Sequence, residues 1–216
     1  LVLKLLYGEG NIRSQNIMGS IESVEAITLD ELKTYYDRYI SPSITRMHVV
    51  GDLGKVNIIG SLQNLITEWK SKDVSIPVFD APSRPETAKV YFYDIPDSKQ
   101  SMLQFGYPAL ASSNPDYYSA VVMNYILGGG GFASRLTQEL REGKGYTYGI
   151  RSSFEGGKVA GPFSISSGVR SNVTYESAQL VKDILSDYAS TYSPQDLETT
   201  QSFMIKSNAR AFETAG

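Results

Sequence analysis

The chain has 216 residues, a net charge of −3, one histidine and no cysteine. This length suffices for one large domain or two small ones, and the 41% hydrophobic and 20% charged residues are ordinary for a soluble globular protein. The acidic balance argues against a nucleic-acid partner. The cysteine and histidine counts exclude disulfides, thiolate metal sites and a site with two imidazoles within this chain. No run of eighteen apolar residues predicts a membrane span.

The first third of the chain predicts two helices on either side of a strand. Thr28 and Glu31 form a capping box at the start of the first helix, and Pro42 ends it. The apolar segment Thr45–Val50 predicts a buried strand. Apolar residues spaced three and four apart between 56 and 69 predict a second amphipathic helix.

A stretch with three prolines and scattered charges, residues 72–86, is the best candidate for a linker. It divides the chain into four predicted parts. They are an N-terminal connector, a helix–strand–helix unit, the linker and a larger domain: residues 1–27, 28–71, 72–86 and 87–216.

Beyond the linker, pairs of strands alternate with pairs of helices. The strands are predicted at Lys89–Ile95, Ser101–Tyr107, Tyr148–Gly156 and Pro162–Arg170, with the first two as neighbours in one sheet. The helices are predicted to begin at Asn114–Pro115, Ser134, Val173 and Ser193–Pro194. This order is typical of the α+β class. We expect a two-layer sandwich, with a largely antiparallel sheet and helices packed on one face.

The stretch from Asn124 to Arg151 is the least generic part of the sequence. Four glycines, Gly128–Gly131, follow an apolar helix, and a short second helix then ends near Arg141. The next strand carries Tyr148, so both side chains could face the same space. A guanidinium offers forked donors to a peptide carbonyl or carboxylate, and a phenol can donate to an oxyanion. The alternative is that Arg141 only ends a helix and Tyr148 packs within the sheet.

Other chemistry has weaker support. The glycines lack the Gly-Lys-Ser/Thr of a phosphate loop and follow a helix rather than a strand, so we interpret Gly128 or Gly129 as a helix cap. The aromatic strand after Lys144 resembles an RNA-recognition strand only faintly, since a second aromatic motif is missing. His48 is interpreted as a structural histidine in a strand rather than a ligand.

Other candidate hydrolytic side chains are also unsupported. The serine pairs at 112–113 and 166–167 have no evident base nearby in the sequence. The carboxylates Asp116, Glu139 and Glu142 fall where helix starts and solvated helix faces favour them.

Around Arg141 and Tyr148 the chain resembles the C-terminal, non-zinc half of the insulinase/pitrilysin family of metallopeptidases, the inverzincins. That family also includes the mitochondrial processing peptidases and the core subunits of a respiratory complex. The resemblance rests on YILGGG, SRL and LREGKGYTYG in this order, with TLDELKTYYDRYISP, VVGDL and IPDSKQSMLQFGYP before them. It covers roughly residues 7–212, and LREGKGYTYG is its most specific piece.

The resemblance implies roles for particular residues. In that family the C-terminal half supplies an arginine and a tyrosine seven residues apart, which hold the substrate backbone and stabilise the tetrahedral intermediate. Arg141 and Tyr148 occupy these positions, which favours Tyr148 over Tyr146. Gly129 and Gly130 resemble in location a glycine-rich substrate loop and are candidate substrate-binding residues.

The zinc site of the family, His-x-x-Glu-His with a downstream glutamate, lies in the other half and has no match here. The resemblance therefore implies the substrate-binding, catalytically incomplete C-terminal portion of a zinc metalloendopeptidase, inactive alone. Zinc, absent from this chain, is expected in a complementary half or partner subunit. The other expected partners are a peptide substrate and, in a homo- or heterodimer, a second subunit. The alternative within the family is a non-catalytic scaffold or assembly subunit.

The resemblance also bears on organisation. Residues 28–70 would be the closing unit of a preceding half, and we hypothesise that they complete the sheet of residues 87–216, so that 28–216 form one compact domain. The sequence does not specify a compartment. We expect a soluble protein of the bacterial cytoplasm or periplasm.

Overall fold

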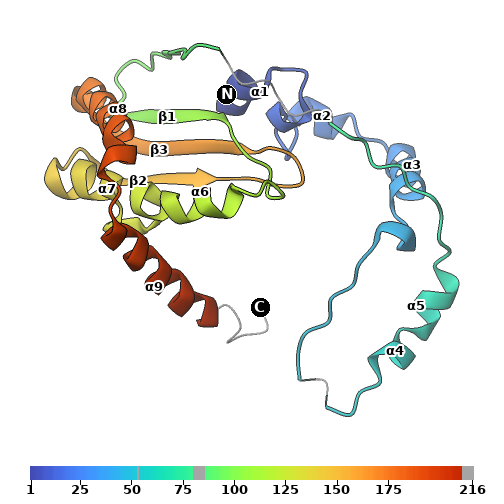
Figure 1. The fold of residues 1–216 in the computed structure, drawn as a ribbon. Coiled ribbons are helices and arrows are strands. Elements are labelled where there is room, and N and C mark those ends of the chain that lie inside the picture. Colours follow the sequence, from blue (N-terminus) through green and yellow to red (C-terminus); the bar gives the residue numbers. More distant parts are fainter. Residues whose placement is uncertain (53, 80–85, 211–216) are drawn as a thin grey trace. The chain divides into compact units, whose positions relative to one another are not determined.

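The computed structural model describes residues 1–52, 54–79 and 86–210 (Figure 1). The chain divides into two compact units. The sheet unit contains Leu1–Ser14 and Asp80–Ala209, and the helical unit contains Gln15–Phe79. Part of the predicted linker, residues 80–85, lies outside the described residues.

A three-stranded antiparallel sheet organises the sheet unit (Figure 1). Its strands are β1 (Gln100–Pro108), β2 (Thr147–Phe154) and β3 (Pro162–Arg170), in the spatial order β1-β3-β2. Alternate residues of β3, from Phe163 to Val169, are buried, whereas those between them are more exposed. Since successive side chains of a strand point to opposite faces, one face of the sheet is covered and the other is open.

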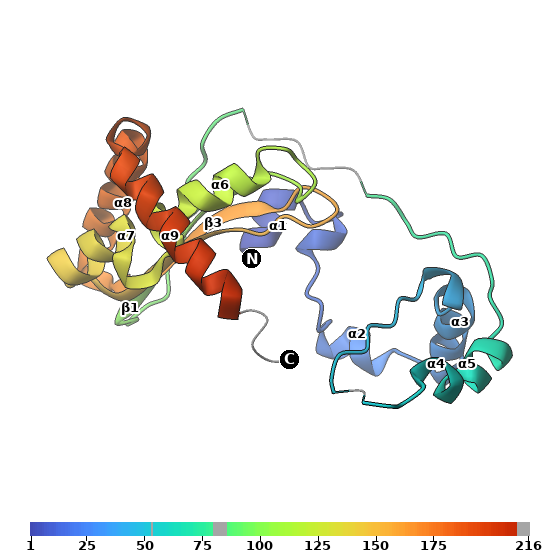
Figure 2. The same cartoon turned by 60° about the horizontal axis from the view of Figure 1, so that its bottom comes forward.

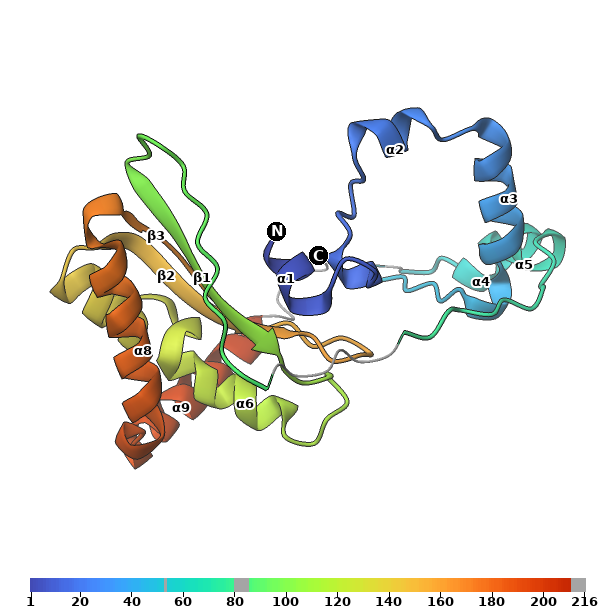
Figure 3. The same ribbon diagram turned by 90° about the horizontal axis from the view of Figure 1, so that it is seen from above.

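Helices cover one face of the sheet, the face to which the buried side chains of β3 point. α6 (Tyr117–Asn124) and α8 (Thr174–Thr191) lie on the same side of the strands (Figure 3), with the short α7 (Arg135–Thr137) beside them. The buried core between the layers joins residues of both: Ala109, Ile126, Leu127, Leu136, Leu140, Ile150, Phe163, Ile165, Val181 and Tyr188. The predicted α+β class, with an antiparallel sheet and helices on one face, is confirmed.

Two irregular turns join α6 to α7, and a third joins α7 to β2. η3 (Tyr125–Gly129) and η5 (Gln138–Gly143) are π-helical, and η4 (Gly131–Ala133) is a 3₁₀ turn. The sequence pattern predicted ordinary helix ends here. Single π-helical turns are rare and occur frequently at functional sites.

The C-terminal helix α9 (Pro194–Arg210) follows α8 after the short turn at Ser193 (Figure 2). Its Phe203 stacks on Tyr125 of η3, with ring centroids 4.7 Å apart. The 3₁₀ turn η6 (Ser171–Val173) joins β3 to α8. The predicted starts of these last two helices agree with the structure.

The N-terminal residues belong to the same unit. α1 (Val2–Tyr7) packs on the open face at β1, where a Cβ added to Gly106 would meet the Leu6 side chain at 3.3 Å. Arg13 of η1 (Ile12–Ser14) donates from Nη2 to the carbonyl of Val159 at 3.3 Å.

The helical unit contains only short helices and turns among its described residues. They are α2 (Ile21–Glu25), α3 (Leu29–Tyr39), η2 (Pro42–Ile44), α4 (Ile58–Ser61) and α5 (Gln63–Glu68). The predicted capping box is present. The amide of Thr28 donates to Glu31 Oε2 at 2.8 Å, and the amide of Glu31 donates to Thr28 Oγ1 at 3.3 Å.

Two predicted strands are absent from the described residues. Thr45–Val50 and Lys89–Ile95 have no assigned strand pairing, and β1 pairs with β3 instead of with 89–95. His48 is exposed rather than held within a strand. An apolar, β-branched segment becomes a strand only where a neighbour satisfies its amides and carbonyls. The predicted helix 56–69 is likewise broken, into α4 and α5.

Candidate functional site

Arg141 and Tyr148 line one open pocket of about 540 Å³ in the sheet unit. Arg141 comes from η5 and Tyr148 from β2. The other lining residues come from β1, η4, α7, β2 and β3: Met102, Gly131, Phe132, Thr137, Gly149, Ile150, Arg151, Ser166, Ser167 and Gly168. The structure thus brings together the two side chains that the sequence singled out.

Tyr148 is the most exposed aromatic of this pocket, with 88% of its surface accessible. The alternative of a tyrosine packed within the sheet is therefore excluded. Tyr146, two residues earlier, is half-buried and does not line the pocket. A phenol that carries no packing role is free to donate a hydrogen bond to a ligand.

A β-bulge determines the direction of Tyr148. Thr147 pairs with Val169 and Ile150 pairs with Ser167, so two residues of β2 stand opposite one residue of β3. Bulges are enriched next to active sites, where they re-aim a side chain. Here the extra residue turns Tyr148 to the open face while Ile150 stays buried, at 3% exposure.

Two hydroxyl groups tie the bulge together. Thr147 Oγ1 lies 2.6 Å from the carbonyl oxygen of Gly168 and accepts from the amide of Gly149 at 3.0 Å. Ser167 Oγ lies 3.0 Å from both Thr147 Oγ1 and the carbonyl oxygen of Gly149. These contacts satisfy backbone groups that the bulge removes from the hydrogen-bond ladder of the sheet. They therefore hold the backbone on both sides of Tyr148 in place.

Arg141 is held by its neighbours. Its guanidinium lies over the ring of Phe132, 4.4 Å from the centroid, and its Nε lies 3.5 Å from Glu142 Oε1. Stacking on an aromatic face orients the planar guanidinium and leaves its edge donors available. Gly145, at φ +61°, follows η5 and turns the chain into β2.

The glycines are placed differently from the prediction of a cap at Gly128 or Gly129. Gly131 has the left-handed conformation, φ +60°, and lines the pocket, whereas Gly129 and Gly130 do not line it. A Cβ on Gly128 would lie 2.8 Å from the Ser152 amide nitrogen, so this glycine lets η3 approach β2 closely.

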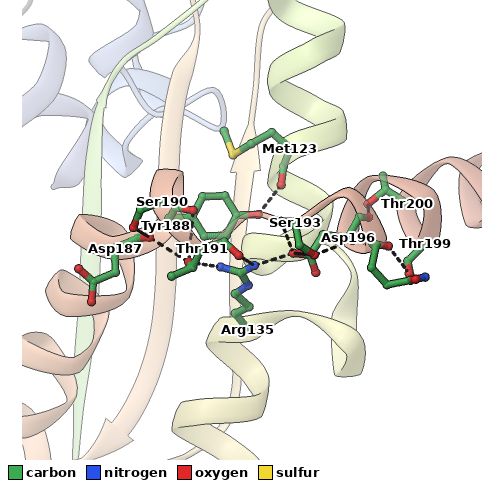
Figure 4. A network of polar contacts seen from close by, with 11 residues as sticks. Met123, Arg135, Asp187, Tyr188, Ser190, Thr191, Ser193, Asp196, Thr199 and Thr200 are labelled. Atoms are coloured by element: carbon green, nitrogen blue, oxygen red, sulfur yellow. Dashed lines mark hydrogen bonds and ion pairs between the residues drawn. The ribbon is translucent and has the colours of Figure 1, made fainter.

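A polar network joins the four helices α6, α7, α8 and α9 (Figure 4). Arg135 of α7 donates through Nη2 to Asp196 Oδ2 at 2.6 Å and to the carbonyl of Thr191 at 2.7 Å, and it lies over the ring of Tyr188, 4.9 Å from the centroid. Tyr188 donates to the carbonyl of Met123 at 2.8 Å. These contacts fix the start of α7, and hence the segment that leads to Arg141.

Ionisation follows from these surroundings. The hydrogen bond from the Ser193 amide, followed by contacts to the Ser193 hydroxyl and Arg135, lowers the pKa of Asp196 despite partial desolvation. Burial raises the pKa of Tyr188 far above that of free tyrosine, so its hydroxyl remains protonated.

Across the residues that the structure describes, no three histidine, cysteine, aspartate or glutamate side chains come together in a way that could hold a metal ion. The described side chains therefore offer no ligand set for zinc, which the family resemblance implies for another half or subunit. None of the described helices is both long enough and apolar enough to cross a membrane.

Sequence reasoning missed several members of the site. Arg151 and Phe132 were not singled out, and the bulge has no clear signal in the sequence. The alternation of a regular strand would have placed Tyr146 and Tyr148 on one face. The signals available were the serine- and threonine-rich strands and the isolated Gly149, since a glycine inside a strand suggests a bulge.

Comparison with known proteins identifies the relatives of this architecture. The family described as "Peptidase M16 inactive domain" matches residues 26–204. The "Non-peptidase homolog YmxG" of Helicobacter pylori is 28% identical over 202 residues, which cover 91% of this chain and 45% of that protein. The "Uncharacterized zinc protease YmxG" of Bacillus subtilis is 23% identical over 185 residues, 86% of this chain and 44% of that protein.

A solved structure of the same family has a similar fold. The crystal structure of a peptidase M16 inactive domain from Pseudomonas fluorescens superposes with a TM-score of 0.81 and 26% identity, covering 94% of this chain and 49% of that one. The chain thus spans less than half the length of the curated relatives that it matches.

Proposed function

The chain belongs to the peptidase M16 inactive-domain family, and from this premise we propose that it forms the substrate-binding wall of a peptide-cleaving zinc protease. The complementary half or a partner subunit would supply the zinc. The observation that carries the proposal is the shared pocket of Arg141 and Tyr148. Homologues named as zinc proteases support it.

The chemistry assigned to Arg141 is positioning. Its guanidinium, stacked on Phe132 at 4.4 Å, would donate to a backbone carbonyl of the bound peptide. Holding the peptide in one geometry lowers the entropic part of the barrier. A lysine at this position would keep the charge but lose the fixed fork.

The chemistry assigned to Tyr148 is electrostatic. Its exposed hydroxyl would donate a hydrogen bond to the oxyanion that develops on the scissile carbonyl. The bulge holds the backbone of Tyr148 in place before substrate arrives, so little reorganisation is needed. Removal of one pre-organised donor of this kind typically lowers kcat on the order of 10²-fold.

The experiment is Tyr148→Phe in the intact assembly, with kcat/KM measured on unstructured peptides. We expect a decrease on the order of 10²-fold, mainly in kcat. Tyr146→Phe is the matched control, because this phenol lies two residues away and does not line the pocket. Unchanged kcat/KM in Tyr148→Phe, or equal losses in both variants, would refute the assignment.

The scaffold alternative predicts a different result. The Helicobacter pylori relative carries the name of a non-peptidase homologue. A pure scaffold has no use for an oriented arginine beside an exposed tyrosine, which is why we favour peptide binding. If the intact assembly neither cleaves nor binds peptides, the scaffold alternative replaces the proposal.

A further inference from the structure

The bulge that directs Tyr148 places this tyrosine on the same face of β2 as a second arginine, Arg151. Tyr148 and Arg151 are three residues apart, and in a regular strand they would point to opposite faces. Because the bulge adds one residue to β2 between Thr147 and Ile150, both side chains reach the open face. Both line the same pocket.

The pocket carries a positive charge that its own lining does not balance. Its described lining includes Arg141 and Arg151 and no aspartate or glutamate, whereas the whole chain has a net charge of −3. Arg141 is partly compensated by Glu142 at 3.5 Å. Within the described residues of the sheet unit, no carboxylate forms an ion pair with Arg151.

A hydroxyl lies across from this arginine. Arg151 pairs in register with Ser166 of β3, and cross-strand partners have Cβ atoms about 5 Å apart. Ser166 Oγ has only a weak contact, 3.9 Å to Met102 Sδ, so its hydrogen can turn toward a stronger acceptor. Gly168, two residues after Ser166 on β3, also lines the pocket. It has no side chain, and the atom nearest to a Cβ built there is 3.8 Å away, so this position leaves space beside Ser166.

We propose that Arg151 and Ser166 form a subsite for a carboxylate of the bound peptide. This inference rests on the proposed function and specifies its substrate class as acidic peptides. The guanidinium binds the carboxylate with two parallel hydrogen bonds, and the serine hydroxyl adds a third. Three residues of strand span at most about 10 Å, so the carboxylate lies roughly two to three residues of extended peptide from the bond at Tyr148.

The test uses the intact protein with its zinc-bearing half. A peptide with both termini blocked carries glutamate, glutamine or lysine at the second and third positions on either side of the cleaved bond. A second arm carries glutamine and a free C-terminal carboxylate, which distinguishes an acidic side chain from a chain end. Cleavage gives kcat/KM, and fluorescence anisotropy of the labelled peptides gives Kd.

In the wild-type protein we expect about a tenfold preference for the carboxylate peptide over the glutamine peptide, the scale of one charge-assisted hydrogen-bonded pair. Arg151→Gln should remove this preference, and Arg151→Glu should reverse it in favour of lysine. Arg170→Gln and Arg170→Glu are the controls. Arg170 lies at the exposed end of β3, does not line the pocket, and changes the net charge by the same amount.

Three outcomes would overturn the subsite. They are an Arg151 variant that keeps the wild-type preference, an Arg170 variant that loses it equally, and a wild-type protein without any preference. The Tyr148→Phe result is independent of these. A rate loss in Tyr148→Phe together with an unchanged preference in Arg151→Gln would leave the proposed function standing and remove only the subsite.

Discussion

The sheet unit and the helical unit use the same local sequence signals but differ in what those signals produce. Both contain capping boxes, at Thr28–Glu31 and at Ser193–Asp196. In the sheet unit, ten buried hydrophobic residues pack together in one core. In the helical unit, Ser41 is the one buried side chain among the described residues.

The difference shows what each kind of interaction can achieve. In the helical unit, Ser41 Oγ donates to the carbonyl of Lys72 at 2.8 Å and accepts from the amide of Lys72 at 3.0 Å, which ties two turns together. Leu29, Leu32 and Tyr36 form the predicted apolar face of α3 and remain more than half exposed. Hydrogen bonds shape these helices, but burial of apolar area supplies most of the stability of a fold.

The largest expected effect is a core truncation compared across the two units. Leu140→Ala removes a fully buried side chain and should lower the free energy of unfolding by about 3 kcal/mol. Leu32→Ala, at a position 55% exposed, should change it by less than about 0.5 kcal/mol. Urea denaturation of the same protein measures both. Equal losses would show that α3 is packed in solution.

A glycine pair gives a smaller effect of the same kind. Gly128→Ala places a methyl group against the Ser152 amide and Leu136, and should cost about 1–3 kcal/mol by overpacking. Gly51→Ala in the helical unit meets nothing within 4 Å and should be close to neutral. Thermal denaturation compares the two. A neutral Gly128→Ala would contradict the close approach of η3 to β2.

The smallest effect concerns the two capping boxes. Asp196 has a lowered pKa in the folded state, so its contribution to stability is complete above the unfolded pKa and is lost as pH falls through the folded pKa. Asp196→Asn should cost roughly 1 kcal/mol at pH 7, as is typical of a lost cap. The difference from wild type should shrink as the pH falls below the usual pKa of a free aspartate and through the lowered folded pKa of Asp196. Urea midpoints as a function of pH measure it.

Glu31→Gln is the matched change in the helical unit. The pKa of Glu31 is also lowered, by hydrogen bonds from Thr28, but its carboxylate contacts no other helix. Asp196 instead joins α9 to Arg135 of α7. We therefore expect Glu31→Gln to leave the unfolding midpoint unchanged. An equal, pH-dependent shift in both variants would contradict the distinction between the units.

The elements that could be predicted from sequence are those whose signals are local. Periodicity and caps located α3, α8 and α9, and alternation with turn residues located β2 and β3. Long-range pairing is not encoded locally, so Thr45–Val50 looks like a strand in the sequence but has no strand partner among the described residues. The division into residues 28–71 and 87–216, and their union in one domain, stay predictions.

The candidate site divides in the same way. Arg141 and Tyr148 were found through a motif, and the structure places them in one pocket. Arg151 escaped because it shares a face with Tyr148 only through a bulge that hydroxyl groups of two strands stabilise together. No single segment contains that information. The glycines attracted attention through composition, yet only Gly131 lines the pocket, and Gly128 serves packing.

The strand order β1-β3-β2 has a practical consequence for handling this protein. Among the described strands β1 is an edge nine residues long, and three exposed side chains along it carry no charge: Gln100, Met102 and Gln104. Uncharged edges invite strand addition from another molecule. Nearby in the sequence, Phe92 and Tyr93 are 85% and 77% exposed, and these aromatic side chains offer apolar surface to a second molecule. Self-association through β1 should therefore increase with the concentration of this chain.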